Sequence, residues 1–525
     1  MSKSEAIWIG AKKGSHSFPF SERGLIWKQN QFKTLGIHFS LSTRSSCMFD
    51  LNYKVKLKQI EGILNCWRAR NLTLIGKICV IKSLLLPQLL YLFSVLCIKI
   101  PKCFFKELDK MFYKFIWNGG NDRVKRVYVR NHYNHCGLRM IDPYNFCLAQ
   151  KMTWVKLLFD NNFNSFWETI ELSGMNQQYG DLLWKSYAPE SLLNKLFCTQ
   201  LADSLRTWYL YRERACQEIY NKNFSDFGYN QCLWYNRNIR SKTKSYIYYE
   251  DWSDKGVLYI NDFLNPPLPG SKLFEELVLD FGISKYDRRK FNFLMECIPS
   301  SWLRGSDQRS EDIFESLSSH LVDVQKIPRF VYSILTGTCT PENRIESWKN
   351  LLDMNGDEDS PEETDWEEIH LRNFKCSIDT KLRSFYFKVF HKAIAFNNFL
   401  FKINRKDSPN CNFCKKFPES SIHIFCECDN IKLIWDDLVK IIQDKEDISF
   451  SISNFEKMFG IYKDNFLTYL FLCVKYYIYV CKFQNKNPTF VGYTSFLKNN
   501  RDTEYYIAKG KGKLSQHFKK WRFDI

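Results

Sequence analysis

The sequence has 525 residues, with 75 Lys or Arg against 57 Asp or Glu and a formal net charge of +18. This length leaves room for three or four domains with ample cores, and the basic excess favours polyanionic partners through counterion release. The 19 cysteines lack the spacing of a disulfide scaffold, and no signal-peptide pattern opens the sequence. These features exclude a small secreted scaffold and predict a reducing compartment, the nucleus and cytoplasm.

Residues 1–45 are predicted to form two or three strands. Apolar and polar side chains alternate around Ile7-Trp8-Ile9 and around Leu35-Gly36-Ile37-His38-Phe39. This alternation is the period of a strand that buries one face.

A helical period follows from Tyr53 to Trp117. The residues that share one face of its first helix are Ile60, Ile63, Leu64 and Trp67. Pro87 and Pro101 are expected to divide the later part into separate helices, because proline lacks the backbone donor that a helix needs. The apolar run Leu84–Ile98 falls short of the roughly 20 residues that span a bilayer, so we expect a buried pair of helices and no membrane partner.

Residues 146–350 are predicted to be mainly short helices, with a linker at Leu264-Asn-Pro-Pro-Leu-Pro-Gly270. Beyond them, residues 353–368 carry nine acidic side chains and no basic one. Asn355-Gly-Asp-Glu-Asp-Ser-Pro361 lies within this stretch, which we expect to be a flexible acidic loop at a domain boundary.

Three further helices are predicted, from about Leu382 to Lys402, from Ile431 to Ile442 and, rich in aromatic residues, from Phe466 to Phe483. The basic residues of the tail that follows are Lys509, Lys511, Lys513, Lys519, Lys520 and Arg522. Aromatic residues make up 17% of the chain, and cations interleaved with rings suit single-stranded nucleic acid, although most of these rings are expected to pack helices.

A cluster of soft and borderline metal ligands lies between the first two of these helices. Cys411-Asn-Phe-Cys414 is followed by His423 and by two further thiols, Cys426 and Cys428. Two thiols, an imidazole and a third thiol suit tetrahedral zinc. Spacing alone leaves the fourth ligand open, because on an ideal helix Cys426 would share the face of His423 better than Cys428.

This region resembles the C-terminal zinc-binding segment of the reverse transcriptases of non-LTR (LINE-type) retrotransposons. The residues that carry the resemblance are Leu382, Phe385, Val389, Asn397, Leu400, Asp407 to Cys411, Pro418-Glu419, Ile422 to Phe425, Cys428 and Trp435. The resemblance implies a zinc ion held by Cys411, Cys414, His423 and Cys428.

Motifs elsewhere resemble the same family in the same order along the chain. Ser4 to Gly10, Trp27 and Phe32 to Ile37 are similar to the last strands of the polymerase palm, and Ile60 to Lys82 to its thumb. Further similarities are Phe115 to Gly119, Gly137-Leu138, Asp142-Pro143, Ala149 with Trp154, Leu233 to Asn236, Trp252, Gly256, Asp262, Ile507-Ala508 and Trp521.

The resemblance implies RNA and DNA as partners, as element RNA and target DNA, and no small-molecule substrate. The candidate nucleic-acid-binding residues are Arg68, Arg70, Lys77 and Lys82 in the thumb-like part and Lys511, Lys513, Lys519 and Lys520 in the tail. The Tyr-X-Asp-Asp hairpin, whose carboxylates hold the two metal ions of nucleotidyl transfer, would lie upstream of residue 7. We therefore expect no catalytic residues here and no polymerase activity of the chain itself.

The expected fold is mainly α, with a short β remnant of the palm, a helical thumb and a helical C-terminal region that contains a small zinc-binding module. The expected divisions are 1–45 (palm remnant), 46–150 (thumb-like), 151–352 (helical linker region), 353–375 (acidic loop and boundary), 376–450 (zinc-binding module) and 451–525 (aromatic helix and basic tail). Two other interpretations remain open. The chain could be a truncated gene model of a full RNA-directed DNA polymerase/endonuclease, or a protein-interaction scaffold stapled by zinc.

Overall fold

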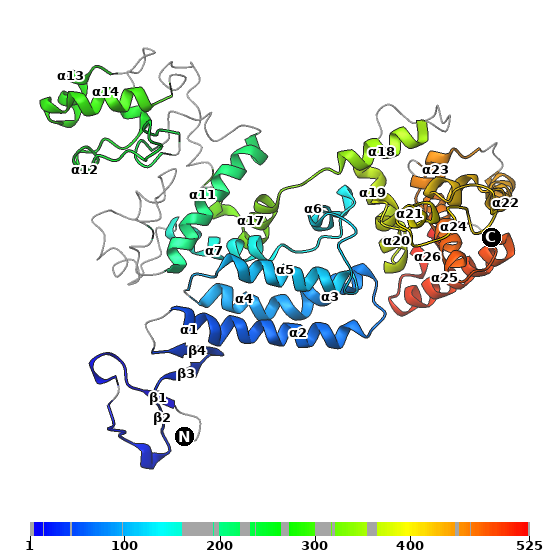
Figure 1. Cartoon of the computed structure of the whole chain (residues 1–525), viewed down its shortest axis with the longest axis horizontal. Coiled ribbons are helices and arrows are strands. Elements are labelled where there is room, and N and C mark those ends of the chain that lie inside the picture. The colour runs from blue at the N-terminus through cyan, green and yellow to red at the C-terminus, as the bar shows by residue number, and fades with distance from the viewer. Residues whose placement is uncertain are drawn as a thin grey trace. The chain divides into compact units, whose positions relative to one another are not determined.

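The computed structural model describes residues 5–13, 15–41, 45–96, 98–159, 193, 199–220, 232–236, 238–263, 272–299, 317, 321–353, 365–446, 451–461 and 464–522. Within these residues the chain is mainly helical, with short strands near its beginning, which confirms the predicted fold class (Figure 1). The chain divides into two compact units. Unit 1 contains residues 1–63, 84–109 and 142–337, and unit 2 contains residues 64–83, 110–141 and 338–525.

The strands at the beginning of unit 1 form two small sheets. β1 (Glu5–Ile7) pairs in parallel with β2 (Ile26–Lys28), and β3 (Gln31–Thr34) pairs antiparallel with β4 (Ile37–Ser40). Leu35 and Gly36 connect β3 and β4 with positive φ angles of 47° and 81°, as a two-residue hairpin turn requires. The four strands exceed the two or three that the sequence predicted, because alternation does not reveal strands of three residues.

Aromatic side chains form the first helical core of unit 1. Tyr53 precedes α2 (Val55–Arg68), and its hydroxyl donates to the Leu92 carbonyl of α4 (Leu86–Val95) at 3.1 Å. The Tyr53 ring lies 5.3 Å from that of Phe104, in the first turn of α5 (Lys102–Ile116). As predicted for one face of α2, Ile60 and Leu64 are buried and Ile63 and Trp67 are half-buried.

Pro87 does not break the helix that contains it, contrary to the sequence prediction. α3 (Leu74–Val80) continues through a π turn, Ile81–Leu85, into α4, and together they form one helix from Leu74 to Val95. Pro87 lies in the first turn of α4. The π turn before it interrupts the regular pattern of α-helical hydrogen bonds. A proline, which has no backbone N–H to donate, is accommodated next to this interruption.

The unbroken helix is longer than the apolar run Leu84–Ile98, which the sequence indicated was too short to span a bilayer. Leu74–Val95 has 22 residues and a mean hydropathy of 1.9 in its most apolar window, of which 44% is buried. A second helix, α24 (Asn465–Phe483), has 19 residues, and 72% of its window is buried. Both are long and apolar enough to cross a bilayer, a criterion that the core helices of soluble proteins also meet.

Two further cores lie in the described part of unit 1. α7 (Pro143–Phe159), α11 (Thr199–Tyr220) and α17 (Ile327–Thr336) pack around the buried Trp208. The short helices α12 (Glu250–Ser253), α13 (Phe274–Phe281) and α14 (Arg288–Cys297) contribute to a separate core that contains Trp234 and Trp252. At 22 residues α11 is longer than the short helices predicted here. The predicted linker at residues 264–270 and the acidic stretch at residues 355–361 lie outside the described residues.

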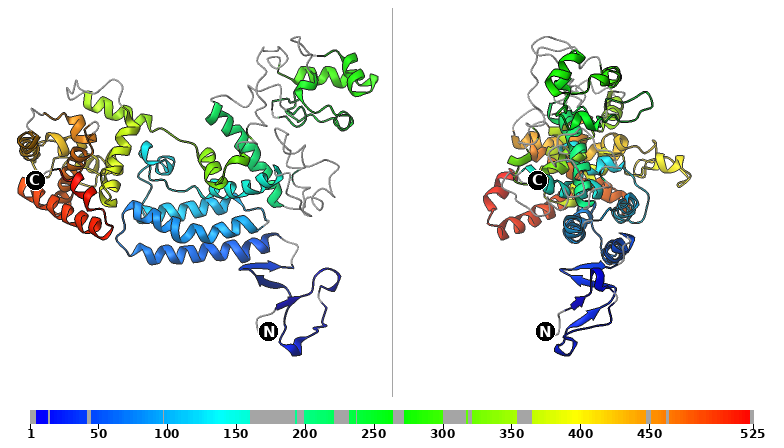
Figure 2. Two further views of the ribbon diagram at one scale, coloured as in Figure 1. Left: turned by 180° about the vertical axis from the view of Figure 1, so that it is seen from behind. Right: turned by 90° about the vertical axis from the view of Figure 1, so that its left-hand side faces the viewer.

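Helices make up most of unit 2. They include α18 (Glu342–Asp353), α19 (Trp366–Lys375), α20 (Thr380–Phe390), α21 (Asn397–Lys402), α22 (Asp429–Glu446), α23 (Asn454–Phe459), α24, α25 (Phe490–Gly510) and α26 (Leu514–Lys520). The views in Figures 1 and 2 agree in placing α24 beside α25, and the two helices are in contact. The helices predicted at 431–442 and 466–483 lie within α22 and α24 and are confirmed.

The single helix predicted from Leu382 to Lys402 is wrong, because the structure divides it into α20 and α21. The chain turns at Lys392, whose φ is 52°, and the Ala393 N–H donates to the Lys388 carbonyl at 2.8 Å. This is a left-handed C-terminal cap formed by a residue other than glycine. The neighbouring His391 side chain fixes the turn, since its Nε2 donates to the Cys136 carbonyl at 2.8 Å.

Candidate metal centre

A tight hairpin presents the first two candidate ligands. Asn410 and Pro418 form an antiparallel bridge, and the Cys411 N–H donates to the Phe417 carbonyl at 2.8 Å. The turn closes at Lys415, whose φ is 59° and whose N–H donates to the Cys411 carbonyl at 3.0 Å. The loop that carries Cys411 and Cys414 is therefore a hairpin held by its own backbone hydrogen bonds.

A π turn presents the other two ligands. His423 begins the π-helical segment His423–Glu427, and the Cys428 N–H donates to the His423 carbonyl at 2.8 Å. Cys428 then leaves the helix with an extended backbone, φ −59° and ψ 128°. The i to i+5 hydrogen bond of this π turn brings Cys428 close to His423, which lies five residues earlier. This geometry removes the argument for Cys426, which assumed an ideal α-helix.

The four candidate ligand atoms lie within 4.8 Å of one another. Cys411 Sγ is 3.9 Å from Cys428 Sγ, and Cys414 Sγ is 3.3 Å from His423 Nε2. A zinc tetrahedron has edges of about 3.8 Å between sulfurs and about 3.6 Å between sulfur and nitrogen, from its bond lengths of about 2.3 and 2.0–2.1 Å. Cys426 is buried and is not a member of the cluster. The donor set and its spacing thus fit zinc.

The electrostatics of the hairpin favour a thiolate at Cys411. A hydrogen bond from the Cys428 thiol, with backbone N–H groups of Cys414 and Phe413, lowers the pKa of Cys411 to about 5. The same shared proton raises the pKa of Cys428. Zinc replaces thiol protons when it binds, and the lowered pKa of Cys411 favours this exchange at that ligand.

Comparison with known families identifies the region around this cluster. Residues 326–435 match the family model described as zinc-binding in reverse transcriptase. All four ligands of the cluster lie inside the match. This part of the chain is a zinc-binding region of the reverse-transcriptase kind, and zinc is its cofactor. Four protein ligands would fill the tetrahedral coordination of a zinc ion, as they do in structural zinc sites.

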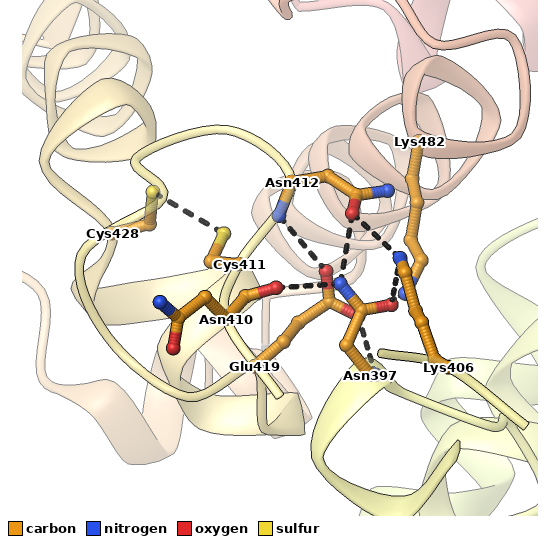
Figure 3. Close-up of polar contacts among 8 residues, drawn as sticks. All are labelled: Asn397, Lys406, Asn410, Cys411, Asn412, Glu419, Cys428 and Lys482. Carbon is orange, nitrogen blue, oxygen red and sulfur yellow. Dashed lines mark hydrogen bonds and ion pairs between the residues drawn. The ribbon is translucent and has the colours of Figure 1, made fainter. Parts of the chain in front are cut away.

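A buried carboxylate anchors the reverse-transcriptase zinc-binding hairpin to its surroundings (Figure 3). Glu419 is fully buried, and its side chain forms an ion pair with Lys482 of α24, which is 8% exposed. The two carboxylate oxygens also accept the N–H groups of Asn397 at 2.9 Å and of Asn412 at 3.4 Å. Burial lowers the pKa of Lys482, and the pairing with Glu419 opposes that effect.

An amide network completes the anchor on the side of α21. Asn397 Nδ2 donates to the Asn410 carbonyl at 2.6 Å and to Asn412 Oδ1 at 2.8 Å. Lys406 Nζ donates to Asn397 Oδ1 and Asn412 Oδ1 at 2.7 and 2.9 Å (Figure 3). Sequence reasoning included Asn397 and Glu419 only as parts of a resemblance and assigned them no role. Their burial depends on partners that a sequence does not place.

The candidate nucleic-acid-binding residues of the thumb-like part differ in exposure. Arg68 and Arg70 are exposed, and the Arg70 guanidinium lies over the Trp67 ring at 4.4 Å. Lys82 is half-buried, and burial together with the nearby Arg139 lowers its pKa to about 8. Lys77 is only 3% exposed, so it is not a residue of an open surface.

The candidates of the tail also fall into two groups. Lys511, Lys513 and Lys519 are exposed. Lys520 instead pairs with Glu504 at 2.7 Å, and its Nζ lies 3.8 Å from the centre of the Tyr469 ring. The role of Lys520 visible in the structure is therefore to hold α26 against α24 and α25.

Proposed function

We propose that this chain is the nucleic-acid-binding, zinc-containing C-terminal part of a non-LTR retrotransposon reverse transcriptase, without polymerase chemistry of its own. The observation that carries the proposal is a zinc-binding region of the reverse-transcriptase kind within a chain of net charge +18. Such an excess of positive charge draws phosphate backbones to a protein. The proposed compartments, nucleus and cytoplasm, are those in which its thiols stay reduced.

The organisation of the chain before the zinc region supports this assignment. Short strands precede a group of long helices, in the order expected for the end of a palm followed by a thumb. An exposed cation next to a ring, such as Arg70 over Trp67, suits contact with a strand whose bases are unpaired. The exposed lysines of the tail offer a second basic patch.

RNA and single-stranded DNA are expected to bind with little sequence preference and with strong salt dependence. Each phosphate that the protein neutralises steepens the fall of log K with log salt by roughly 0.7 on single strands. Changing Arg68 and Arg70 to Glu, or Lys511, Lys513 and Lys519 to Glu, should weaken binding and flatten this slope. Affinity would be measured by fluorescence anisotropy between about 50 and 200 mM salt, where several phosphate contacts lose most of their strength.

A matched control for the change of two charges in the thumb-like cluster is Lys285→Glu with Arg289→Glu, since both residues are exposed and lie outside both clusters. This variant should bind as the wild type does. A flat response to salt, or unchanged affinity when both clusters are reversed, would remove nucleic acid from the proposal. The zinc-stapled interaction scaffold would then be the better interpretation.

No template-dependent DNA synthesis by this chain is expected. Its sequence contains no Tyr-X-Asp-Asp motif, and two-metal nucleotidyl transfer needs such carboxylates. The adjacent pair Asp436 and Asp437 lies exposed on α22. Primer extension on an RNA template with magnesium or manganese would measure the activity. Synthesis clearly above that of a mock purification would contradict the expectation.

A further inference from the structure

Unit 2 contains a cavity of about 320 Å³ that is separate from the zinc cluster. It lies where the start of α3, the end of α5 and the following loop meet α20 and α24. The side chains that line it and are used below are Lys77, Trp117, Arg123, Lys381, Ser384, Phe385, Lys388, Tyr476 and Tyr479. Ligand pockets in proteins begin at about 300 Å³, so the cavity is large enough for one small ligand.

The charged residues that line the cavity are all cations. They are Lys77, Arg123, Lys381 and Lys388, and neither Asp nor Glu is among the lining residues. In the part of the chain that the structure describes, none of the four forms an ion pair. Burial, with repulsion from Lys388 and Arg68, lowers the pKa of Lys77 to about 8, and burial and Arg123 lower the pKa of Lys388. An anion in the cavity would relieve this repulsion.

Lys77 is held in place inside the cavity wall. Its Nζ donates to the Ile116 carbonyl at 3.1 Å and to Asn118 Oδ1. An ammonium group has three donors, so one remains after these two bonds. The other cations are more accessible, since Arg123 and Lys381 are exposed and Lys388 is half-buried.

Aromatic rings form another wall of the same cavity. The Phe385 ring lies 5.3 Å from Tyr476 and 5.1 Å from Tyr479, and the two tyrosine rings are 6.1 Å apart. Both tyrosines are half-buried, whereas Phe385 is buried behind them. A half-exposed ring beside cations is the arrangement on which a nucleic-acid base stacks.

Two buried polar groups on lining residues have no hydrogen-bond partner within the described part of the chain. Trp117 Nε1 and Ser384 Oγ have no hydrogen-bond partner among the described residues, although the side chains of Trp117 and Ser384 are only 8% and 4% exposed. Buried donors in native proteins are usually satisfied, and each exception calls for a reason. A polar ligand in the cavity they line is such a reason.

We propose that this cavity binds one nucleotide, with its phosphate among the four cations and its base against Tyr476 and Tyr479. The inference rests on the proposed function and adds to it a defined site for one unpaired nucleotide. The same chemistry is offered by a free mononucleotide and by one nucleotide of a single strand. The cavity volume admits either but excludes a duplex.

Thymidine monophosphate and an oligothymidylate of about 12 nucleotides would be titrated into the full zinc-loaded chain by calorimetry. The charge variant is Lys388→Gln with Arg123→Gln, and the stacking variant is Tyr479→Leu. The matched control is Lys285→Gln with Arg289→Gln, which removes the same charge from two exposed residues outside the cavity and outside both basic clusters. A separate tail variant, Lys511→Gln with Lys513→Gln, reports on strand binding by the tail. We expect each cavity variant to weaken mononucleotide binding at least about tenfold, because stacking and charge both contribute, and the control to leave it unchanged.

The two probes distinguish a free mononucleotide from one nucleotide of a single strand as the ligand of the cavity. Weaker binding of both probes by the cavity variants supports a nucleotide within a strand, and weaker binding of the mononucleotide alone supports a free nucleotide. Mononucleotide binding that neither cavity variant weakens overturns the inference. Strand binding that still responds to the tail variant would then leave the proposed function intact. Inorganic phosphate that binds as tightly as the mononucleotide overturns the role of the rings.

Discussion

Replacing Cys428 by Ser is expected to abolish zinc binding and to unfold the hairpin between α21 and α22. Cys428 is fully buried and completes the cluster with Cys411, Cys414 and His423. A structural zinc ion contributes on the order of 10 kcal/mol to the folding of small modules, and a serine hydroxyl replaces a thiolate poorly as a zinc ligand. The zinc content measured by elemental analysis should fall from about one ion per chain to none. Proteolysis around residues 397–430 should become faster.

The matched control is Cys426→Ser, the same chemical change two residues earlier. Cys426 is 1% exposed, so a serine there has a packing cost but should retain the metal. Cys411→Ser should behave as Cys428→Ser does. Retention of zinc by Cys428→Ser together with its loss in Cys426→Ser would mean that the fourth ligand has been assigned incorrectly.

Replacing Glu419 by Ala is expected to lower the unfolding free energy of unit 2 by about 3–5 kcal/mol. The substitution leaves the Lys482 ammonium buried without its carboxylate, and it removes the acceptor of the Asn397 N–H. Breaking a buried ion pair on one side has a cost of this size, because the remaining charge stays desolvated. The measurement is denaturant unfolding of the zinc-loaded chain, followed by hydrogen exchange of α24.

The double variant Glu419→Gln with Lys482→Met is the control for Glu419→Ala. It removes both charges while the amide of Gln can still accept the Asn397 N–H, so it should recover much of the lost stability. A destabilisation of less than about 1 kcal/mol in Glu419→Ala would show that Lys482 reaches water and that the pair acts as a surface ion pair does.

The zinc ligands could be predicted from the sequence because their spacing is local, but the choice of Cys428 over Cys426 came from the family resemblance and not from the spacing. The difference depends on whether the backbone after Ile422 follows an α or a π turn, and ligand spacing does not encode that choice. Pro87 is a similar case. It signalled a break in the helix, but a π turn next to it accommodated the proline.

The residues that sequence reasoning did not assign depend on distant partners. Glu419 pairs with a lysine of α24, and the cavity joins α3 and α5 to α20 and α24. The turn at Lys392, which divides a predicted helix, is fixed by a carbonyl at Cys136. Hydrophobic periodicity finds each helix separately, but it does not reveal which buried charges and rings the helices bring together.

The Glu419–Lys482 pair has a consequence for synthesis on the ribosome. Glu419 is translated 63 residues before Lys482, which corresponds to about 3–13 s at 5–20 residues per second. The last zinc ligand, Cys428, is translated nine residues after Glu419, so for most of that interval the ligands are complete while Lys482, the partner of the carboxylate, has not been made. The nascent hairpin can thus bind zinc before it can pack against α24. A polypeptide that terminates before α24 has all four zinc ligands but lacks Lys482, the cation with which Glu419 pairs when it is buried.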